Sequence, residues 1–357
     1  MSKAKILLAI VGLILSGCIS SEAQSAVKSN PSKALSFQEV EPIPTHTDES
    51  NHRKAIFAAT RQQLGDRDFD TLEKTAQAFR DSKESYIHGS WALTSFYLGV
   101  ADIDYSLPDV QCIEFLNKIR AWISAKPNSA TARIALAHAL TDYAWKARGI
   151  EWADSVSEEG GTLMAERLAE AQKLLDEARK LPTKCPAWWA TAQSVALGQG
   201  WDKKRYFALF EEATKFEPGY IDFYDNAVLY LQPRWHGEEG ESEKFIEYHA
   251  NERNGIDADI FYARMIWLLD LRRLDKNLFD AHPRLSWART ASGFDQLLKR
   301  YPDSLSVKSE YARLCFKTHD KKRAGPLYQQ IGLNMDVRIW LDDVASFKVY
   351  RKWALEE

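Results

Sequence analysis

The residues of this chain with the widest chemical range lie in short, irregular segments. In the segment LQPRWHGEEG, Trp235 and His236 stand between Pro233 and Gly237. An indole face can stack on a sugar or a cation, and a guanidinium group can clamp a carboxylate or phosphate with two hydrogen bonds. Tryptophan and arginine are also the residue types that dominate binding hot spots. Comparable segments are AWKARGIEW (144–152), GQGWD (198–202), AHPRLSW (281–287) and KTHD (317–320).

No recognisable catalytic or cofactor-binding motif accompanies these segments. The sequence has no GxSxG, HExxH, GxGxxG, GxxxxGKS or GxxxxGKT string and no EF-hand loop. His236 with Glu238 and Glu239 supplies ligand types for a divalent cation, but a turn alone does not fix their geometry. We therefore predict no catalytic residue, no metal site and no cofactor.

Amphipathic helices must position these segments. From about residue 51, apolar residues recur with the spacing i, i+3, i+4, and alternating strand patterns are almost absent. Prolines at 127, 186, 218 and 302 each stand just ahead of a new helical pattern, where proline is tolerated. The pattern predicts an all-α domain over residues 51–357. Its expected hairpins are roughly 51–82, 86–126, 127–181, 186–217, 218–254, 256–300 and 302–331.

The last hairpin is the most similar to a tetratricopeptide repeat (TPR). Tyr311 and Ala312 form its large–small pair on the first helix, and Ala324 and Tyr328 take its small and aromatic positions on the second. The steps between the four prolines are 59, 32 and 84 residues, in place of a steady repeat of about 34. The predicted fold is therefore a TPR-like α-hairpin solenoid with irregular repeats.

Three strings resemble a bacterial family of exported, TPR-like proteins of unknown function. They are ALTDYAWKARG (139–149), ALGQGWDKKRY (196–206) and LQPRWHGEEGE (231–241), in this order. The resemblance extends over roughly residues 85–332. It implies an α-hairpin fold and supplies no activity, substrate or functional residue.

In a stack of hairpins, the turns inside the hairpins lie along one edge and the turns between hairpins lie along the other. The irregular segments all fall inside predicted hairpins, whereas the proline-led turns such as LPTKCP fall between them and only reverse the chain. Loop residues on a rigid scaffold often carry function, so we predict a binding edge. In the alternative interpretation, the indoles fill gaps between hairpins and the basic side chains cap helix ends. The candidate edge consists of Arg148, Trp201, Arg234, Trp235, His236, His282, Arg284 and Trp287, with Trp145, Trp152 and His319 beside them.

The first 17 residues predict a lipoprotein signal peptide. Lys3 and Lys5 precede an apolar run, and the string Leu15-Ser16-Gly17-Cys18 resembles the bacterial lipobox. Cys18 would then carry the acyl chains that anchor the mature chain. Residue 19 is Ile rather than Asp, which favours the outer membrane, facing the periplasm.

Residues 18–50 are predicted to form a disordered tether between the lipid and the helical domain. This segment is rich in Ser, Pro, Glu and Lys and has no helical periodicity. The remaining cysteines are Cys112, Cys185 and Cys315, and three unpaired, buried thiols are favoured over a disulfide. If one pair forms, Cys112 with Cys185 is the first of three possible pairings.

Two functions fit these features. The first is a membrane-anchored, non-catalytic module that binds a protein or peptide partner in the bacterial cell envelope. The second is a small-ligand-binding protein or enzyme that uses the candidate edge, for example on cell-wall fragments. Removal of the signal peptide would remove Lys3 and Lys5, which leaves 45 of the 47 basic side chains against 50 acidic ones. Because the mature chain would be mildly acidic, nucleic acid is not an expected partner.

Overall fold

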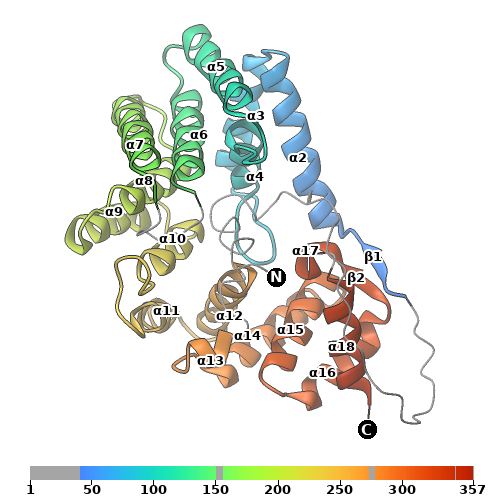
Figure 1. Ribbon diagram of the computed structural model, residues 1–357. Helices are drawn as coiled ribbons and strands as arrows, with labels where there is room; N and C mark the ends of the chain where they lie inside the picture. Colours follow the sequence, from blue (N-terminus) through green and yellow to red (C-terminus); the bar gives the residue numbers. More distant parts are fainter. Residues whose placement is uncertain (1–40, 150–155, 273–277, 342, 357) are drawn as a thin grey trace. The chain divides into compact units, whose positions relative to one another are not determined.

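The computed structural model describes residues 41–149, 156–272, 278–341 and 343–356. The predicted signal peptide and Cys18 lie outside these ranges. Over the described residues the chain forms 17 helices and two short strands, which confirms the all-α, helical-repeat fold (Figure 1). None of the helices in these ranges combines the length and hydropathy that a membrane span requires. The described residues divide into a first unit, Asp48–Arg300, and a second unit of residues 41–47 and 301–356.

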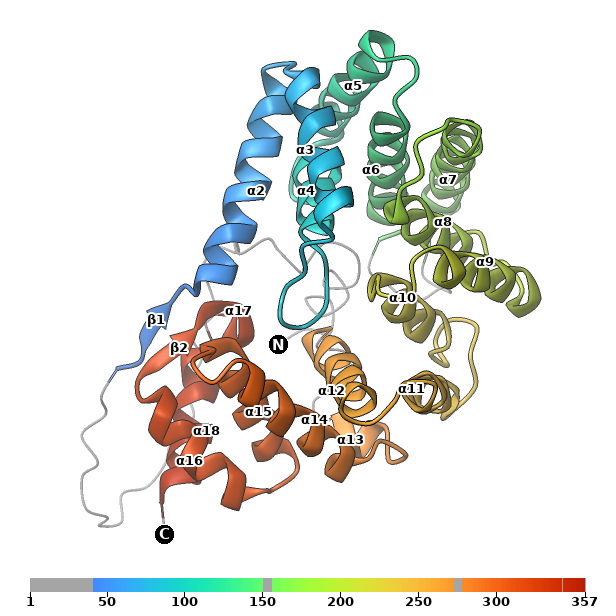
Figure 2. The ribbon, with the colours of Figure 1, turned by 180° about the vertical axis from the view of Figure 1, so that it is seen from behind.

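The first unit is a series of helical hairpins with the predicted boundaries. Its helices lie side by side in chain order (Figures 1 and 2). The hairpins are α2/α3, α4/α5, α6/α7, α8/α9, α10/α11 and α12/α14, with the single turn α13 inside the last. The helices are α2 (Asp48–Gly65), α3 (Phe69–Ser82), α4 (Ala92–Ala101), α5 (Asp109–Ala125), α6 (Ala130–Arg148), α7 (Glu158–Arg179), α8 (Pro186–Gly198), α9 (Lys203–Phe216), α10 (Asp222–Tyr230), α11 (Glu241–Asn251), α12 (Ile256–Leu271), α13 (Leu278–Ala281) and α14 (Trp287–Arg300).

The helix starts follow the sequence signals. Ser129, two residues after Pro127, caps α6 by accepting a hydrogen bond from Ala132 N at 2.8 Å. Pro186 takes the first position of α8, where its missing N–H costs nothing. Each cap satisfies or removes an amide that the helix cannot pair internally.

The first and second helices of the hairpins differ in burial. Nine of the ten residues of α4 are buried, whereas only four of the 17 residues of α5 are. The first helices from α4 to α12 form the core row, and the second helices cover it with one apolar stripe each. The first helix of the unit, α2, is buried at only five of its 18 residues and is not part of this row. Close approach of α2 and α4 depends on Gly99, since a Cβ there would lie 1.8 Å from Thr60 Oγ1.

The loop between α3 and α4 fills the space beside the core row. His88 in this loop is 0 % exposed, and its ring lies 5.6 Å from that of Trp267 in α12. Arg264 of α12 donates from Nε to Ile87 O at 2.8 Å. The loop thus ties the second hairpin of the unit to its last one (Figure 2).

The second unit contains the TPR-like hairpin and a small parallel sheet. Its elements are β1 (Ile43–Thr45), α15 (Leu305–Lys317), α16 (Lys321–Ile331), β2 (Asn334–Asp336), α17 (Val337–Trp340) and α18 (Val344–Leu355). Four residues were assigned to TPR positions, and all four are at most 1 % exposed: Tyr311, Ala312, Ala324 and Tyr328. These positions therefore belong to the core of the hairpin.

The prediction of a tether extending to residue 50 needs correction. Residues 43–45 pair with β2 in the register Ile43↔Asn334 to Thr45↔Asp336, and α2 begins at Asp48. Ile43 N donates to Leu333 O at 2.8 Å. A strand of three residues is too short to show an alternating pattern, and its partner lies almost 300 residues away in the sequence.

Candidate functional site

The predicted edge is a continuous row of contacts within the first unit. Trp145, at the end of α6, packs edge-to-face on Trp235 of the α10–α11 turn, with ring centroids 5.3 Å apart. The guanidinium of Arg148 lies 5.7 Å from the centroid of each of these two rings. Burial lowers the pKa of Arg148. The ends of two hairpins that are not consecutive in the sequence therefore meet in one aromatic–cationic cluster.

His236 is held by stacking. Its ring lies 4.6 Å from that of Tyr230, which in turn stacks on Tyr206 at 3.8 Å. The hydroxyl of Tyr230 donates to Trp201 O at 2.5 Å, which joins the α8–α9 turn to this stack. Gly237 permits the tight turn, since a Cβ there would lie 1.8 Å from Leu231 O. The position of His236 thus follows from packing.

The other side chains of the α8–α9 and α10–α11 turns also find partners within the unit. Trp201 Nε1 donates to Gln199 Oε1 at 2.8 Å, and the Arg205 guanidinium stacks 3.2 Å from the centroid of its indole. Arg234 donates to Gln232. These contacts fix the turns on the ends of their own helices.

The α12–α14 connection completes the row. Arg284 is exposed and lies against Gly240, where a Cβ would come within 2.9 Å of Arg284 Cδ. His282 Nδ1 lies 3.0 Å from Oε1 of the buried Glu243. Burial raises the pKa of Glu243, but its hydrogen bonds to His282 and neighbouring groups outweigh that effect, and the pKa lies below its ordinary value. Trp287 packs edge-to-face on Phe279 at 5.6 Å.

Two residues of the edge remain apart from this row. His319 belongs to the second unit, where it is exposed in the α15–α16 turn, and Trp152 lies outside the described residues. Within the ranges that the structure describes, no group of three or more His, Cys, Asp or Glu side chains is placed to hold a metal ion. The geometry of the row fits the interpretation that these side chains fasten successive hairpins to one another.

A pocket of about 320 Å³ lies on the opposite edge, between the hairpins α6/α7 and α8/α9. The proline-led turn LPTKCP, expected only to reverse the chain, forms part of its wall. The pocket is lined by Ala130, Ile134, Ala178, Arg179, Thr183, Lys184, Cys185, Trp188, Trp189, Glu212, Lys215 and Phe216.

Three aromatic side chains form the apolar wall of the pocket. Trp188 and Trp189, at the start of α8, meet edge-to-face at 5.3 Å, and Trp189 stacks on Phe216 of α9 at 4.4 Å. Trp188 is fixed because its Nε1 donates to Leu175 O at 2.8 Å. Phe216 is 43 % exposed, so an aromatic face is open to solvent at the mouth of the pocket.

The rim of the pocket is cationic. Arg179 Nη2 donates to both oxygens of Glu212, at 2.7 and 2.8 Å, and these two charges neutralise each other. Lys184 Nζ donates to two carbonyls at the end of α7, and Lys215 is exposed beside Phe216. Neither lysine forms an ion pair with a described residue.

A titratable cluster lies in the second half of α6. Asp142 is 1 % exposed, and the backbone hydrogen bond of Ile103 offsets only part of the cost of burying its charge. Burial, and next the charge of Asp102, raise the pKa of Asp142 well above its usual range. Burial raises the pKa of Asp102 to about 6 and lowers the pKa of His138 to about 4. His138 Nε2 lies 3.8 Å from Asp142 Oδ2, so these groups make the stability of the unit depend on pH.

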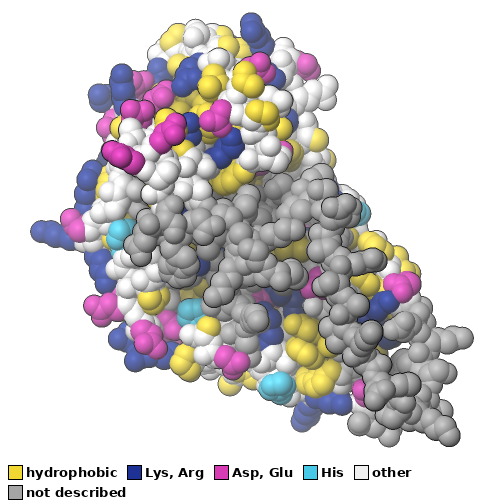
Figure 3. All heavy atoms as spheres, in the orientation of Figure 1, with side chains coloured by type: hydrophobic (Ala, Val, Ile, Leu, Met, Phe, Trp, Pro, Cys, Tyr) yellow, Lys and Arg dark blue, Asp and Glu magenta, His cyan; other side chains and the backbone are white. Residues whose placement is uncertain are grey.

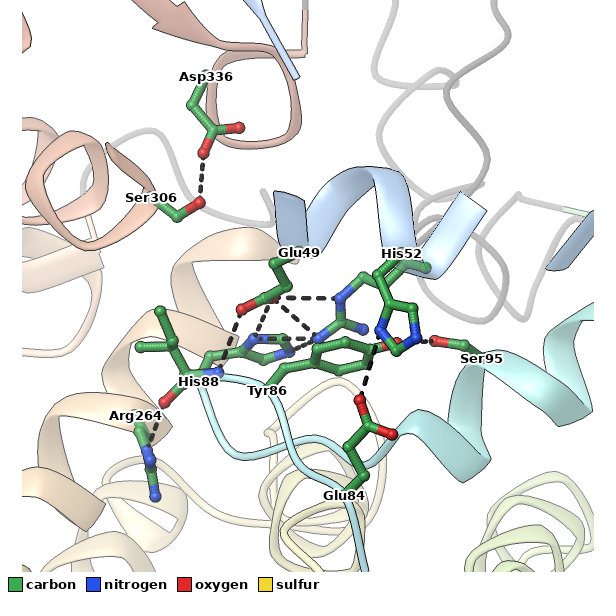
Figure 4. Close-up of polar contacts among 11 residues, drawn as sticks. Glu49, His52, Glu84, Tyr86, His88, Ser95, Arg264, Ser306 and Asp336 are labelled. Atoms are coloured by element: carbon green, nitrogen blue, oxygen red, sulfur yellow. Dashed lines mark hydrogen bonds and ion pairs between the residues drawn. The ribbon is translucent and has the colours of Figure 1, made fainter. Parts of the chain in front are cut away.

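A buried ionic cluster fixes the loop before α4 (Figure 4). Arg53 of α2, 1 % exposed, lies 3.3 Å from the ring centroid of Tyr86 and donates to Glu49 Oε1 at 3.1 Å. Glu49 also accepts from Ile87 N at 3.2 Å, and its Oε1 lies 3.4 Å from His88 Nδ1. Glu49 and Arg53 of α2 thereby contact Ile87 and His88 of the loop, so the role of the cluster is to position the loop.

The burial of the cysteines agrees with the sequence analysis. Cys112, Cys185 and Cys315 are buried, and in the part of the chain that the structure describes no disulfide joins any two of them. On the face shown in Figure 3, Lys and Arg side chains alternate with Asp and Glu among the described atoms and form no continuous basic stripe.

The fold therefore defines an all-α helical-repeat protein with an aromatic pocket between two of its hairpins. Residues 52–197 match the sequence profile of a family described as a domain of unknown function (DUF4034). This match begins in α2 and ends in α8, so it includes most of the pocket wall. No curated protein and no solved structure matches the chain.

Sequence reasoning missed the pocket. The one signal for it was the pair Trp188–Trp189, which begins two residues after Pro186 and places two large aromatic residues at a helix start. Phe216 gave no signal, because it continues the apolar pattern of α9.

Proposed function

We propose that this chain is a non-catalytic helical-repeat module that binds an apolar segment of a protein or peptide partner in the bacterial cell envelope. The observation that carries the proposal is the exposed ring of Phe216, stacked on the buried Trp189, at the pocket between the two hairpins. The volume of the pocket, about 320 Å³, is at the lower end of the volumes of ligand pockets, so the pocket suits one bulky side chain better than a large cofactor.

Rigid construction of the pocket favours binding. The α6/α7 and α8/α9 hairpins each contribute an end of both helices, and Trp188 is fixed by its hydrogen bond to Leu175 O. A preformed apolar wall spares a partner the entropy of ordering the site, which raises affinity for the same contact area.

The location of the module in the envelope rests on the sequence. The lipobox at Cys18 would anchor the mature chain to the membrane, and Ile19 favours the outer membrane, facing the periplasm.

A random peptide library tests the binding proposal. Peptides enriched on the wild-type chain should share a bulky apolar residue and lose at least about tenfold in affinity for Phe216→Ala, measured by isothermal titration calorimetry. Phe216 is 43 % exposed, so the substitution should leave the fold intact. The matched control is Tyr248→Ala, which removes an aromatic ring 60 % exposed on α11. Enriched peptides that bind both variants equally well would reject the pocket as the binding site.

The second candidate is recognition of a small ligand at the edge that carries Arg148. It is favoured by the partly desolvated guanidinium between Trp145 and Trp235, a combination that can hold an anion or a sugar. A thermal-shift screen with cell-wall fragments tests it, since a ligand that binds only the folded chain must raise the midpoint. An unchanged midpoint at concentrations far above a plausible Kd would discard this candidate.

A further inference from the structure

We infer that the pocket between the α6/α7 and α8/α9 hairpins recognises a residue that combines a bulky apolar side chain with a free carboxylate, which is the C-terminal residue of a partner chain. This inference rests on the proposed function and names the chemistry of its ligand.

The charge of the pocket is set by its two lysines. The starts of α6 and α8 and the ends of α7 and α9 all meet there, so the positive and negative ends of the helix dipoles oppose one another. Arg179 and Glu212 cancel as a pair. Lys184 and Lys215 remain, and both line the pocket without an acidic partner among the described residues.

An anionic ligand group fits these lysines. Lys184 Nζ uses two of its three donors on Arg179 O and Leu181 O, which leaves one donor for a ligand. Lys215 is exposed beside the ring of Phe216. A carboxylate at the rim would gain charge-assisted hydrogen bonds without displacing an existing ion pair.

The size of the pocket decides between a C-terminus and an internal acidic residue. Within about 320 Å³ the apolar group and the carboxylate must lie close together. At a C-terminus, the α-carboxylate and the side chain leave the same Cα atom. In an extended internal segment, consecutive side chains point to opposite sides, so an apolar residue and a neighbouring acid would not enter together.

The test compares three hexapeptides that share the core sequence and end in phenylalanine: the free acid, the C-terminal amide, and the acid extended by two glycines. Binding is measured by isothermal titration calorimetry. We expect the free acid to bind at least tenfold more tightly than the other two. For Lys215→Gln this preference should fall several-fold while the melting temperature stays unchanged. Lys204→Gln, exposed on the same helix, is the matched control and should retain the preference.

The outcomes separate this inference from the proposed function. Equal binding of the acid and the amide would refute carboxylate recognition and leave apolar binding in place. Failure of all three peptides at millimolar concentration would also refute the inference, and the library peptides would then decide the proposed function. Decanoate bound as tightly as the acid peptide would assign the pocket to free fatty acids and overturn the C-terminal assignment.

Discussion

Replacing Asp142 with asparagine is expected to stabilise the first unit, by an amount that grows with pH. The carboxyl is 1 % exposed, and its burial outweighs the backbone hydrogen bond of Ile103 and the charge of Arg61, which both favour the ionised form. Its ionised form is therefore costly inside the helix stack. The pKa of Asp142 is raised well above 3.8, chiefly by burial, so the folded chain keeps a proton that the unfolded chain releases. Asparagine has nearly the same shape and no titratable proton.

The sign and size of the effect follow from this pKa shift. A group whose pKa is raised by folding contributes its full stability below the unfolded value, here 3.8, and loses it as the pH rises to the folded value. The loss is about 1.4 kcal/mol for each pH unit within that window. The gain of Asp142→Asn over wild type should therefore be small at pH 4 and rise by up to that slope for each unit toward neutral pH.

Urea unfolding followed by circular dichroism at pH 4, 5, 6 and 7 measures this gain. Asp66→Asn, exposed at the end of α2, is the control and should stay within about 0.5 kcal/mol of wild type at every pH. A gain that does not change with pH, or a loss of stability at pH 7, would refute the reasoning that burial makes the ionised carboxyl costly.

Three further predictions concern the packing, the second titrating group and the anchor. Gly99→Ala should lower the free energy of unfolding by about 3 kcal/mol, because its Cβ would lie 1.8 Å from Thr60 Oγ1, and adding Thr60→Ala should recover part of the loss in urea unfolding. His138→Gln should leave the free energy of unfolding unchanged at pH 7.5 but raise it by about 3 kcal/mol at pH 4. The reason is that burial lowers the pKa of His138 from 6.5 to about 4, so the folded chain resists a protonation that the unfolded chain accepts; an unaltered pH profile would contradict this. Cys18→Ser should move the chain from the membrane to the soluble fraction and remove the lipid from its intact mass; an unchanged distribution would contradict the anchor.

The hairpins could be predicted from the sequence because their signals are local. Apolar spacing defined the helices, and Pro127 and Pro186 marked helix starts that the structure places at Ala130 and Pro186. The placement of the Trp- and Arg-bearing turns along one edge followed from the same frame, since all turns of one kind share an edge of the stack.

The features that sequence did not predict depend on residues far apart in the chain. The pocket joins Ile134, Trp188 and Phe216 from three different helices, and each alone reads as an ordinary apolar position. Pairing of β1 with β2 needs a partner almost 300 residues away. The burial of Asp142 was also hidden, because an acidic residue in an amphipathic helix is usually solvated.

The burial of the core row bears on where a partner can bind. Helical-repeat stacks commonly bind along the surface formed by one row of helices. In this chain other parts of the protein already cover that row, because α4 is buried at nine of its ten residues and the loop with His88 packs against α12. Arg53 of α2 donates from Nε and Nη2 to Glu49, which in turn accepts from Ile87 N of the loop and holds it in place. An incoming segment would have to displace this buried network. The edges of the stack remain, and on one of them the indoles and histidines already contact one another. The exposed ring of Phe216 lies on the other edge, together with Lys184 and Lys215. A partner could therefore contact there both apolar surface and positive charge that no ion pair with a described residue neutralises.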